Sequence, residues 1–385
     1  MDEDSDNSTV DEKLKEKILD KLDNTRTVLN AKEIGTDYNY KHEIVWKNAI
    51  GFLILHVLAL MGLYIAVTGV LPFLAVFIAL VSSEAITIGA HRYYTHRSFK
   101  ATPLLRAYLI LTQAMAGQNS MFIWCRDHRL HHRYSDTDAD PHNAKRGFFF
   151  CHIGWLMTKK HPYVIELGKR IDMTDLLNDK MVMYYYYLYF LLSVAIPVLV
   201  PVYFFGDSLV NAFLACYAFR YAFQLNGTWL VNSLAHLYGT RPYDKNLQPV
   251  ESWFVSFLSL GEGWHNYHHA FPWDYKAAEL SELFNFTADI IKFFEKVGLA
   301  YDLKTASPEM NRIMKTGDGT HAVLGNDEAK AEVTAWGPLH PLNPSFNSKF
   351  SAPDAVLTQR GLPLYHENDV FDSQDNVVKR NVSSA

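Results

Sequence analysis

Long apolar segments alternate with polar ones along this chain, and the apolar segments come in two pairs. The first pair covers residues 45–70 and 71–90, and the second covers about 184–205 and 209–232. A helix of about 20 apolar residues crosses the roughly 30 Å hydrocarbon core of a bilayer. The pattern therefore predicts an all-α integral membrane protein with four transmembrane helices in two hairpins, rather than a soluble protein with buried helices.

The distribution of basic residues predicts how these helices are oriented. The short connections inside the hairpins, near residues 68–72 and 206–208, carry no Lys or Arg, whereas residues 91–181 and everything after 240 are rich in both. Basic residues are retained on the cytosolic side of a membrane. The large polar segments and both termini are therefore expected in the cytosol, where they would form a helical cap on the membrane domain.

The segments that flank the predicted membrane domain, residues 44–306, differ from it in composition. Residues 1–43 are highly charged, and their apolar positions recur at helical spacing, which fits either a short amphipathic surface helix or a solvated tail. Residues 307–385 are polar and include the Pro-rich stretch PLHPLNPSF. That composition predicts a largely disordered cytosolic tail without chemistry.

Charge and cysteine content narrow the class of protein further. The net charge is −5, which does not favour a nucleic-acid partner. The three cysteines, Cys125, Cys151 and Cys216, form no CxxC pair and argue against a disulfide framework. A reducing, cytosol-facing environment fits this composition.

Eight of the 17 histidines fall in three tight clusters. HRYYTH contributes His91 and His96, HRLHH contributes His128, His131 and His132, and HNYHH contributes His265, His268 and His269. In the second and third clusters the spacing i, i+3, i+4 places the imidazoles on one face of a helix. His91 and His96 would lie about 140° apart on a regular helix, so we expect the helix to end or bend between them.

The predicted topology places all three clusters on one side of the membrane, so they can share a metal site. Imidazole binds zinc, copper and iron alike. Eight imidazoles exceed the needs of one ion and indicate two, whereas zinc is held by three or four protein ligands, so a zinc-dependent membrane enzyme is a rival interpretation. Most of the remaining histidines are expected to be structural, namely His42, His56, His142, His152, His161, His321, His340 and His366.

From about residue 46 to 317 the sequence resembles the animal acyl-CoA desaturases of the stearoyl-CoA desaturase type, especially insect members. The resemblance includes the three histidine boxes and the stretches DTDADPHNAKRGFFFCHIGW, TWLVNSLAHLYGTRPYD and GEGWHNYHHAFPWDY. It implies a ninth ligand, His236, and an iron-bound water held by Asn232. It also implies one iron on His91, His96, His132 and His269, and another on His128, His131, His236, His265 and His268.

The resemblance implies an oxidoreductase of fatty acid biosynthesis that uses O2 to put a double bond into a long-chain acyl-CoA. Acyl methylenes carry no acidic proton, so two oxygen-activating Fe2+ ions are expected to remove hydrogen instead of acid–base groups. The resemblance also implies that the two electrons required come from NAD(P)H through a reductase and cytochrome b5. The sequence shows no nucleotide fingerprint or haem-binding domain, so the electron donor is expected to be a separate protein. The implied location is the endoplasmic reticulum membrane, with several spans and both termini cytosolic.

The resemblance also implies a substrate site. It places Arg126, Asp127, Lys159 and Lys160 near the CoA group, Asn48 and Asn119 near the start of the acyl chain, and Gln118, Trp124, Thr228 and Trp229 along the bend of the acyl tunnel. Without it, the cations would be a positive face beside anionic lipid, and the tryptophans ordinary packing. Asp138 and Asp140 are candidates to orient ligand imidazoles. The alternative, held as equal, is that both are structural carboxylates without a role at the metal site.

The second predicted span departs from the family at Ser83 and Glu84, where the family is commonly apolar or small. A carboxylate within a membrane is costly and is usually paired or functional. One hypothesis is that Glu84 or its neighbours contact the methyl end of the acyl chain; the alternative is a hydrogen bond from Glu84 to another helix. The rival activities are hydroxylation, triple-bond or conjugated-diene formation on the same scaffold, and an inactive lipid-binding homologue.

Overall fold

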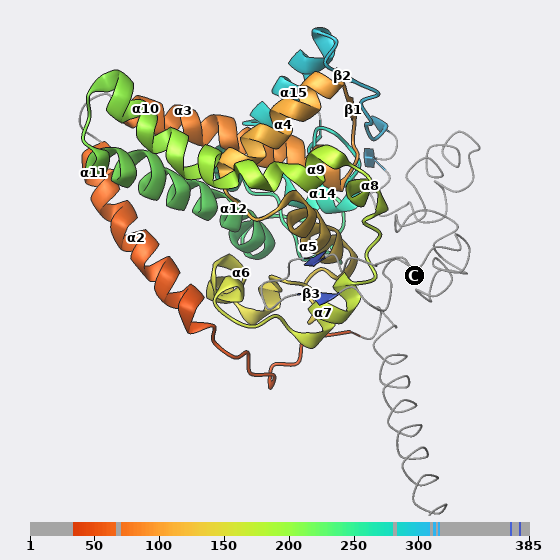
Figure 1. The fold of residues 1–385 in the computed structure, drawn as a ribbon. Helices are drawn as coiled ribbons and strands as arrows, with labels where there is room; N and C mark the ends of the chain where they lie inside the picture. Colours follow the sequence, from red (N-terminus) through yellow and green to blue (C-terminus); the bar gives the residue numbers. More distant parts are fainter. Residues whose placement is uncertain are drawn as a thin grey trace, which may run out of the picture.

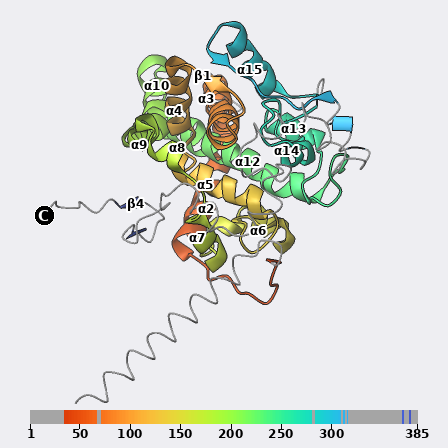
Figure 2. The same cartoon turned by 90° about the vertical axis from the view of Figure 1, so that its right-hand side faces the viewer.

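The computed structural model describes residues 34–66, 71–279 and 283–308, together with Asn311, Arg312, Lys315 and two short strands near the C-terminus. Nearly all of the regular structure is helical (Figures 1 and 2). The predicted N-terminal surface helix and most of the predicted C-terminal tail lie outside the described residues. Within the tail, β3 (Val370–Phe371) pairs antiparallel with β4 (Val377–Val378).

Two described helices are long and apolar enough to cross a membrane, at Trp46–Ile65 and Phe73–Thr95. The first is α2 (Trp46–Ala66), on which Leu53, Leu60 and other large apolar side chains are exposed, as on a lipid-facing helix. The second is α3 (Leu71–Glu84), which continues directly into the π-helix η1 (Ala85–Thr95). These candidate spans coincide with the first two predicted spans, and the second runs to Thr95 rather than to residue 90.

The third predicted span, 184–205, corresponds to a bent pair of helices. Its first piece is α9 (Lys180–Tyr184) with η4 (Tyr185–Leu188), and its second is the π-helix η5 (Leu191–Ala195) with α10 (Ile196–Phe205). The pieces meet at 52° and form a third candidate span if they are taken together.

The fourth predicted span, 209–232, is helical but more polar than expected. It is formed by α11 (Leu209–Ala212), the π-helix η6 (Phe213–Phe219) and α12 (Arg220–Leu237). This run contains Arg220 and Gln224, both buried, and does not count among the apolar spans of the described residues. The structure therefore has two candidate spans, or three with the bent pair, where the sequence predicts four.

Shorter helices gather at one end of the long ones and form the cap (Figure 1). Before α9 the cap contains α4 (Pro103–Ala116), α5 (Met121–Tyr134), η2 (Ala144–Arg146), α6 (Phe148–His152), η3 (Gly154–Leu156), α7 (Pro162–Gly168) and α8 (Thr174–Leu177). After α12 it contains α13 (Trp253–Leu258), α14 (His265–Ala270) and α15 (Phe286–Lys296). The strand β1 (Lys100–Ala101) pairs antiparallel with β2 (Ala300–Tyr301) and so ties the two parts of the cap together.

Local capping residues fix where α4 ends and α5 begins. Gly117, with φ of 72°, ends α4 in a left-handed conformation that favours glycine. The hydroxyls of Tyr189 and Tyr221 both donate to the Gly117 carbonyl. Ser120 then begins α5, because its hydroxyl accepts a hydrogen bond from the amide of Ile123. These contacts set the position of α5, the helix that carries the second histidine cluster.

Candidate metal centre and substrate cavity

The three histidine clusters converge, together with His236 on α12, into two adjacent groups. Within each group the candidate ligand nitrogens lie within 4.8 Å of one another. One group contains His91, His96, His128, His132 and His268, and the other contains His131, His236, His265 and His269. The nine predicted histidines therefore come from η1 and its end, α5, α12 and α14, and meet at one place beneath the cap.

The π-helix η1 explains how two histidines five residues apart reach the same group. The amide of His96 donates to the carbonyl of His91 at 3.1 Å, which is the i→i+5 hydrogen bond of a π-helix. The two imidazole rings consequently lie 4.9 Å apart between centroids. The helix ends at Thr95, between the two histidines as the sequence predicts, and His96 is its C-cap residue; the wider turn of the π-helix was not predicted.

Each i, i+3, i+4 cluster divides between the two groups instead of pointing to one ion. On α5, His128 and His132 belong to the first group and His131 to the second. On α14, His265 and His269 belong to the second group and His268 to the first. This grouping differs from the ligand partition implied by the resemblance: His128 and His268 lie with the first group instead of the second, and His269 with the second instead of the first. The reason is that residues four apart lie over one another on a helix, while the residue between them is turned aside.

The spacing of the imidazole nitrogens fits bound metal ions. An imidazole nitrogen binds a divalent ion such as zinc at about 2.1 Å, so two nitrogens at right angles are about 3.0 Å apart. The Nε2 atoms of His91 and His268 are 2.9 Å apart, and those of His268 and His132 are 3.0 Å apart. In the second group, Nε2 of His236 is buried and has no hydrogen-bond partner among the described residues. A metal ion would satisfy that nitrogen.

The environment favours the neutral, metal-binding form in most of these imidazoles. Burial, with the neighbouring imidazoles, lowers the pKa of His132 and that of His269 well below the ordinary histidine value. The same causes act on His128, His265 and His268. A buried cluster of neutral nitrogens with their lone pairs turned inward is suited to a cation.

Three buried carboxylates hold the imidazoles from behind. Asp140 Oδ2 lies 2.9 Å from Nδ1 of His131, and Asp136 Oδ2 lies 3.1 Å from Nδ1 of His236. Glu262 Oε2 lies 2.8 Å from Nδ1 of His91. Such contacts orient the ring and fix which nitrogen faces the metal. The prediction for Asp140 is confirmed, and the sequence reasoning missed Asp136 and Glu262.

Asp138, the other carboxylate proposed from the sequence, contacts no ligand imidazole among the described residues. Its carboxylate pairs with Arg146 at 2.6 Å and accepts a hydrogen bond from the amide of Asp37. Asp138 is therefore a structural residue that joins the segment before α2 to the cap. The spacing SDTDAD alone could not separate its role from those of Asp136 and Asp140.

Arg92, the residue after the first ligand, secures Glu262. The Nε and Nη2 atoms of Arg92 donate to Oε1 of Glu262 at 3.1 and 2.9 Å, and its Nη1 donates to the carbonyls of Tyr275 and Lys276. Burial alone would raise the pKa of Glu262, but Arg92 and His91 outweigh it and lower the pKa to about 2. Glu262 is thus a fixed anion beside the first histidine group.

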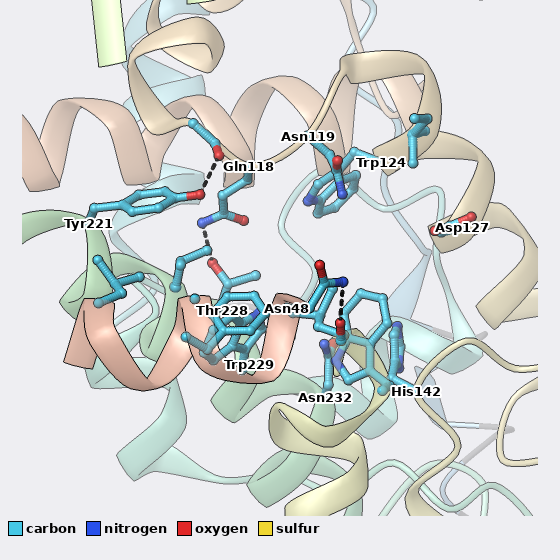
Figure 3. Close-up of a pocket in the computed structure, with 18 of the residues that line it drawn as sticks. Asn48, Gln118, Asn119, Trp124, Asp127, His142, Tyr221, Thr228, Trp229 and Asn232 are labelled. Atoms are coloured by element: carbon cyan, nitrogen blue, oxygen red, sulfur yellow. Dashed lines mark hydrogen bonds between the residues drawn. The ribbon is translucent and has the colours of Figure 1, made fainter. Parts of the chain in front are cut away.

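A large cavity opens beside the histidines (Figure 3). Its volume is about 570 Å³, and its wall includes His128 and Asn232 as well as apolar and aromatic side chains. Seven of the ten predicted substrate residues line it, namely Asn48, Gln118, Asn119, Trp124, Asp127, Thr228 and Trp229. Gln118 Nε2 donates to the hydroxyl of Thr228 at 2.9 Å, which joins α12 to the turn between α4 and α5 across the cavity.

Comparison with known proteins identifies the family. The fatty acid desaturase family model matches residues 42–303. An acyl-CoA Delta-9 desaturase of Acheta domesticus is 51% identical over 296 residues, which cover 74% of this chain and 82% of that protein. This chain belongs to the fatty acid desaturase family.

Other relatives of this desaturase differ in their named activities. A stearoyl-CoA desaturase of Mesocricetus auratus is 48% identical over 288 residues, covering 73% of this chain and 81% of that protein. A (11Z)-hexadec-11-enoyl-CoA conjugase of Bombyx mori is 47% identical over 291 residues, covering 73% and 88%. The family membership makes the chain an oxidoreductase of lipid metabolism whose histidine groups form its metal site.

Three predicted substrate residues of the desaturase lie outside the large cavity. Arg126 and Lys160 both pair with Asp127, at 2.8 and 3.0 Å, and Asp127 lines the cavity. Lys159 is exposed and pairs with Glu43 at 2.9 Å. Arg126 and Lys160 therefore contact a residue of the cavity wall without lining the cavity themselves, and Lys159 lies on the protein surface.

The specificity candidates of the desaturase, Ser83 and Glu84, point to different places. Ser83 lines a second, smaller cavity of about 80 Å³ whose wall also includes His91, His128 and His265. Glu84 is buried, and its Oε2 accepts hydrogen bonds from the hydroxyls of Thr87 and Thr287 at 3.2 and 3.3 Å. Because Thr287 belongs to α15, Glu84 makes the contact with another helix that was the alternative interpretation of this residue.

Proposed function

We propose that this desaturase introduces a double bond into a long-chain fatty acyl-CoA, using O2 and two iron ions held by the nine histidines. The observation that carries the proposal is the placement of two adjacent groups of imidazoles beside a large cavity, whose wall includes His128 of the first group. The retention of all nine ligands argues against an inactive lipid-binding homologue. The names of the insect and mammalian relatives supply the acyl-CoA substrate class.

The protein residues hold and orient the metal site. His91, His96, His128, His132 and His268 would hold one iron, and His131, His236, His265 and His269 the other, with Asn232 placed on the cavity wall to hold a water. When bound, the irons would supply the O2 activation that removal of hydrogen from an unactivated methylene requires. Asp136, Asp140 and Glu262 keep the imidazoles turned toward the site.

The cavity would bind the acyl chain and exclude water from it. Trp124 lines both cavities and its ring lies 5.0 Å from that of His128, so the chain would pass the histidines at this point. The hydrogen bond from Gln118 to Thr228 would confine the chain beyond it. At the other end, Arg126, Lys159 and Lys160 would pair with the phosphates of CoA.

The electrons and the membrane arrangement are further parts of the proposal. Cytochrome b5 and its NAD(P)H-dependent reductase would supply two electrons per double bond. The chain would sit in the endoplasmic reticulum membrane with four spans and both termini in the cytosol, the fourth span being the helical run from Leu209 to Leu237. Support for that span comes from the packing of η6 and α12 against α2 and α3.

A conjugase is the second candidate activity. The Bombyx mori relative named as a conjugase is nearly as similar to this chain as the desaturases are. The same histidines and cavity would serve both activities, because a conjugase also removes two hydrogens from an acyl chain. The two candidates differ in whether the substrate already contains a double bond.

The test is expression in yeast that lacks its own desaturase, followed by mass spectrometry of fatty acids derivatised at their double bonds. A new monounsaturated acid from the wild-type chain, absent with His128→Ala, supports desaturation and gives the double-bond position. A conjugated diene formed only when a monounsaturated acid is fed supports the conjugase. A hydroxylated product, or no product from a chain that contains iron, would contradict both.

A further inference from the structure

Protons must reach the metal centre in every turnover, because the proposed reaction consumes them. Removing two hydrogens from adjacent methylenes forms one C=C bond, and reducing O2 to two waters with those hydrogens requires two more electrons and two more protons. A separate electron-carrier protein would supply the electrons. This inference rests on the proposed function, and it concerns how the two protons arrive.

The smaller cavity adjoins the histidines, and polar side chains line one part of a wall that is otherwise mainly apolar. Its wall contains the side chains of Ser83, Thr87, Gln224 and Asn232, close to His91 and His265. Nε2 of Gln224 is buried and has no hydrogen-bond partner among the described residues. With about 80 Å³ the cavity has room for about two water molecules, each of which occupies about 30 Å³ in the liquid.

Glu84 lies directly behind this cavity and connects to it through Thr87. The Thr87 hydroxyl is 3.2 Å from Glu84 Oε2, and Thr87 itself lines the cavity. Glu84 keeps 9% of its surface exposed, whereas Thr287 on its other side is completely buried. The Glu84 carboxyl is therefore separated from the smaller cavity by the Thr87 side chain, whereas Glu262, His91, His128 and His265 line that cavity directly.

The charged residues near Glu84 pair with each other and form no ion pair with Glu84 in the described part of the chain. The charged groups that act on it most are Arg92 and Glu262, and these two pair with each other at 2.9 Å. No ion pair of Glu84 itself is found in the described part of the chain, where its partners are the two threonine hydroxyls. A carboxyl that serves only to dock a helix has no need to exchange protons. A carboxyl that lies one hydroxyl group away from a cavity beside a proton-consuming site can supply a proton to it.

We propose that Glu84 is a proton-relay residue, which passes protons through the Thr87 hydroxyl to the smaller cavity beside the metal centre. In each transfer the Glu84 carboxyl gives its proton to the Thr87 hydroxyl while that hydroxyl gives its own to the cavity, and the carboxylate is then reprotonated from the exposed side. Glu84 acts on the reaction through Thr87 and does not contact the acyl chain.

The test compares Glu84→Gln, Glu84→Asp and wild type as full-length, iron-containing protein in reconstituted vesicles with the electron donor. Glutamine keeps the shape and a hydrogen-bond acceptor but carries no exchangeable acid proton, whereas aspartate restores one. We expect Glu84→Gln to desaturate on the order of 10²-fold more slowly at unchanged KM. It should also release peroxide and consume more O2 per double bond, and Glu84→Asp should recover part of the coupling.

Two threonine variants separate proton relay from helix docking. Thr87→Val should reproduce the uncoupling of Glu84→Gln, and combining the two should add little to either. Thr287→Val removes the α15 side of the contact, so it should lower the unfolding temperature while leaving O2 consumed per double bond unchanged. Iron content and unfolding temperature are measured for every variant, since neither depends on turnover.

The outcomes separate this inference from the proposed function. Wild-type coupling in a stable Glu84→Gln variant would overturn the relay while leaving desaturation intact. Equal uncoupling by Thr287→Val and Thr87→Val would also overturn it, because docking would then explain both. A wild-type chain that holds iron but forms no unsaturated product would overturn the proposed function and the relay with it.

Discussion

Single side chains behind the histidines set how firmly the metal is held. Asp140 accepts from His131, whereas Asp138, two residues earlier, binds Arg146 and no ligand imidazole among the described residues. Replacing Asp140 by Asn should weaken iron binding about 10- to 100-fold, because His131 loses the charge that orients it. Asp138→Asn is the matched control and should keep iron affinity. Chelator competition on both purified variants measures this, and equal affinities would contradict the assignment.

The hydroxyl of Thr228 should matter for where the double bond is placed. It accepts from Gln118 across the large cavity, and a hydrogen bond of this kind contributes about 1 kcal/mol. Thr228→Val keeps the volume but frees Gln118, so we expect products with the double bond at more than one position. Thr228→Ser, which keeps the hydroxyl, should retain the wild-type position. A single unchanged position in both variants, determined by mass spectrometry, would refute this role.

At the residue scale, the sequence predicted the ligands better than their supports. The histidines were found because their local spacing is itself the signature of a metal site. Glu262 and Asp136 were not found, because they reach His91 and His236 only after residues 171 and 100 positions apart are brought together by folding. The division of the histidines between the two groups could not be predicted for the same reason, since it depends on how α5 and α14 face each other.

Among the elements, α2 packs closely against η6 at Gly62. A methyl group added at Gly62 of α2 would overlap the backbone carbonyl of Leu214, whereas one added at Gly51 of the same helix meets nothing within 4 Å. Gly62→Ala should therefore lower the free energy of unfolding by about 1–3 kcal/mol, and Gly51→Ala should not. Thermal unfolding of the two purified variants in one detergent measures this, and equal midpoints would contradict the packing.

Helices could be predicted from the sequence where they coincide with a long, uninterrupted run of apolar residues. The apolar runs gave α2 and α3 directly, but no residue pattern distinguishes the π-helix η1 from an α-helix. Its i→i+5 bonds depend on the surrounding helices and on local contacts such as that from the Thr95 hydroxyl to the Ala90 carbonyl. The fourth span was expected to be uniformly apolar, yet α12 carries Arg220, whose charge is satisfied by backbone carbonyls of Cys216, Met115 and Ser193.

For the whole molecule, the orientation in the membrane is a testable consequence of the charge distribution. The three native cysteines are buried, so an introduced cysteine can be labelled selectively. Lys145→Cys, in the cap, should react with a membrane-impermeant maleimide in sealed vesicles with the cytosolic face outward. Asp207→Cys, between α10 and α11, should react only after permeabilisation. The reverse pattern would overturn the orientation and the cytosolic placement of the histidines.

Four separate parts of the chain contribute histidines to the metal site, and the proposed function assigns two iron ions to it. The most direct test is the metal content of purified protein, measured by mass spectrometry for wild type, His96→Ala and His265→Ala. We predict two irons in wild type and about one in each variant, because the substitutions fall in different groups. One ion per wild-type chain, or zinc in place of iron after iron-replete expression, would contradict the account.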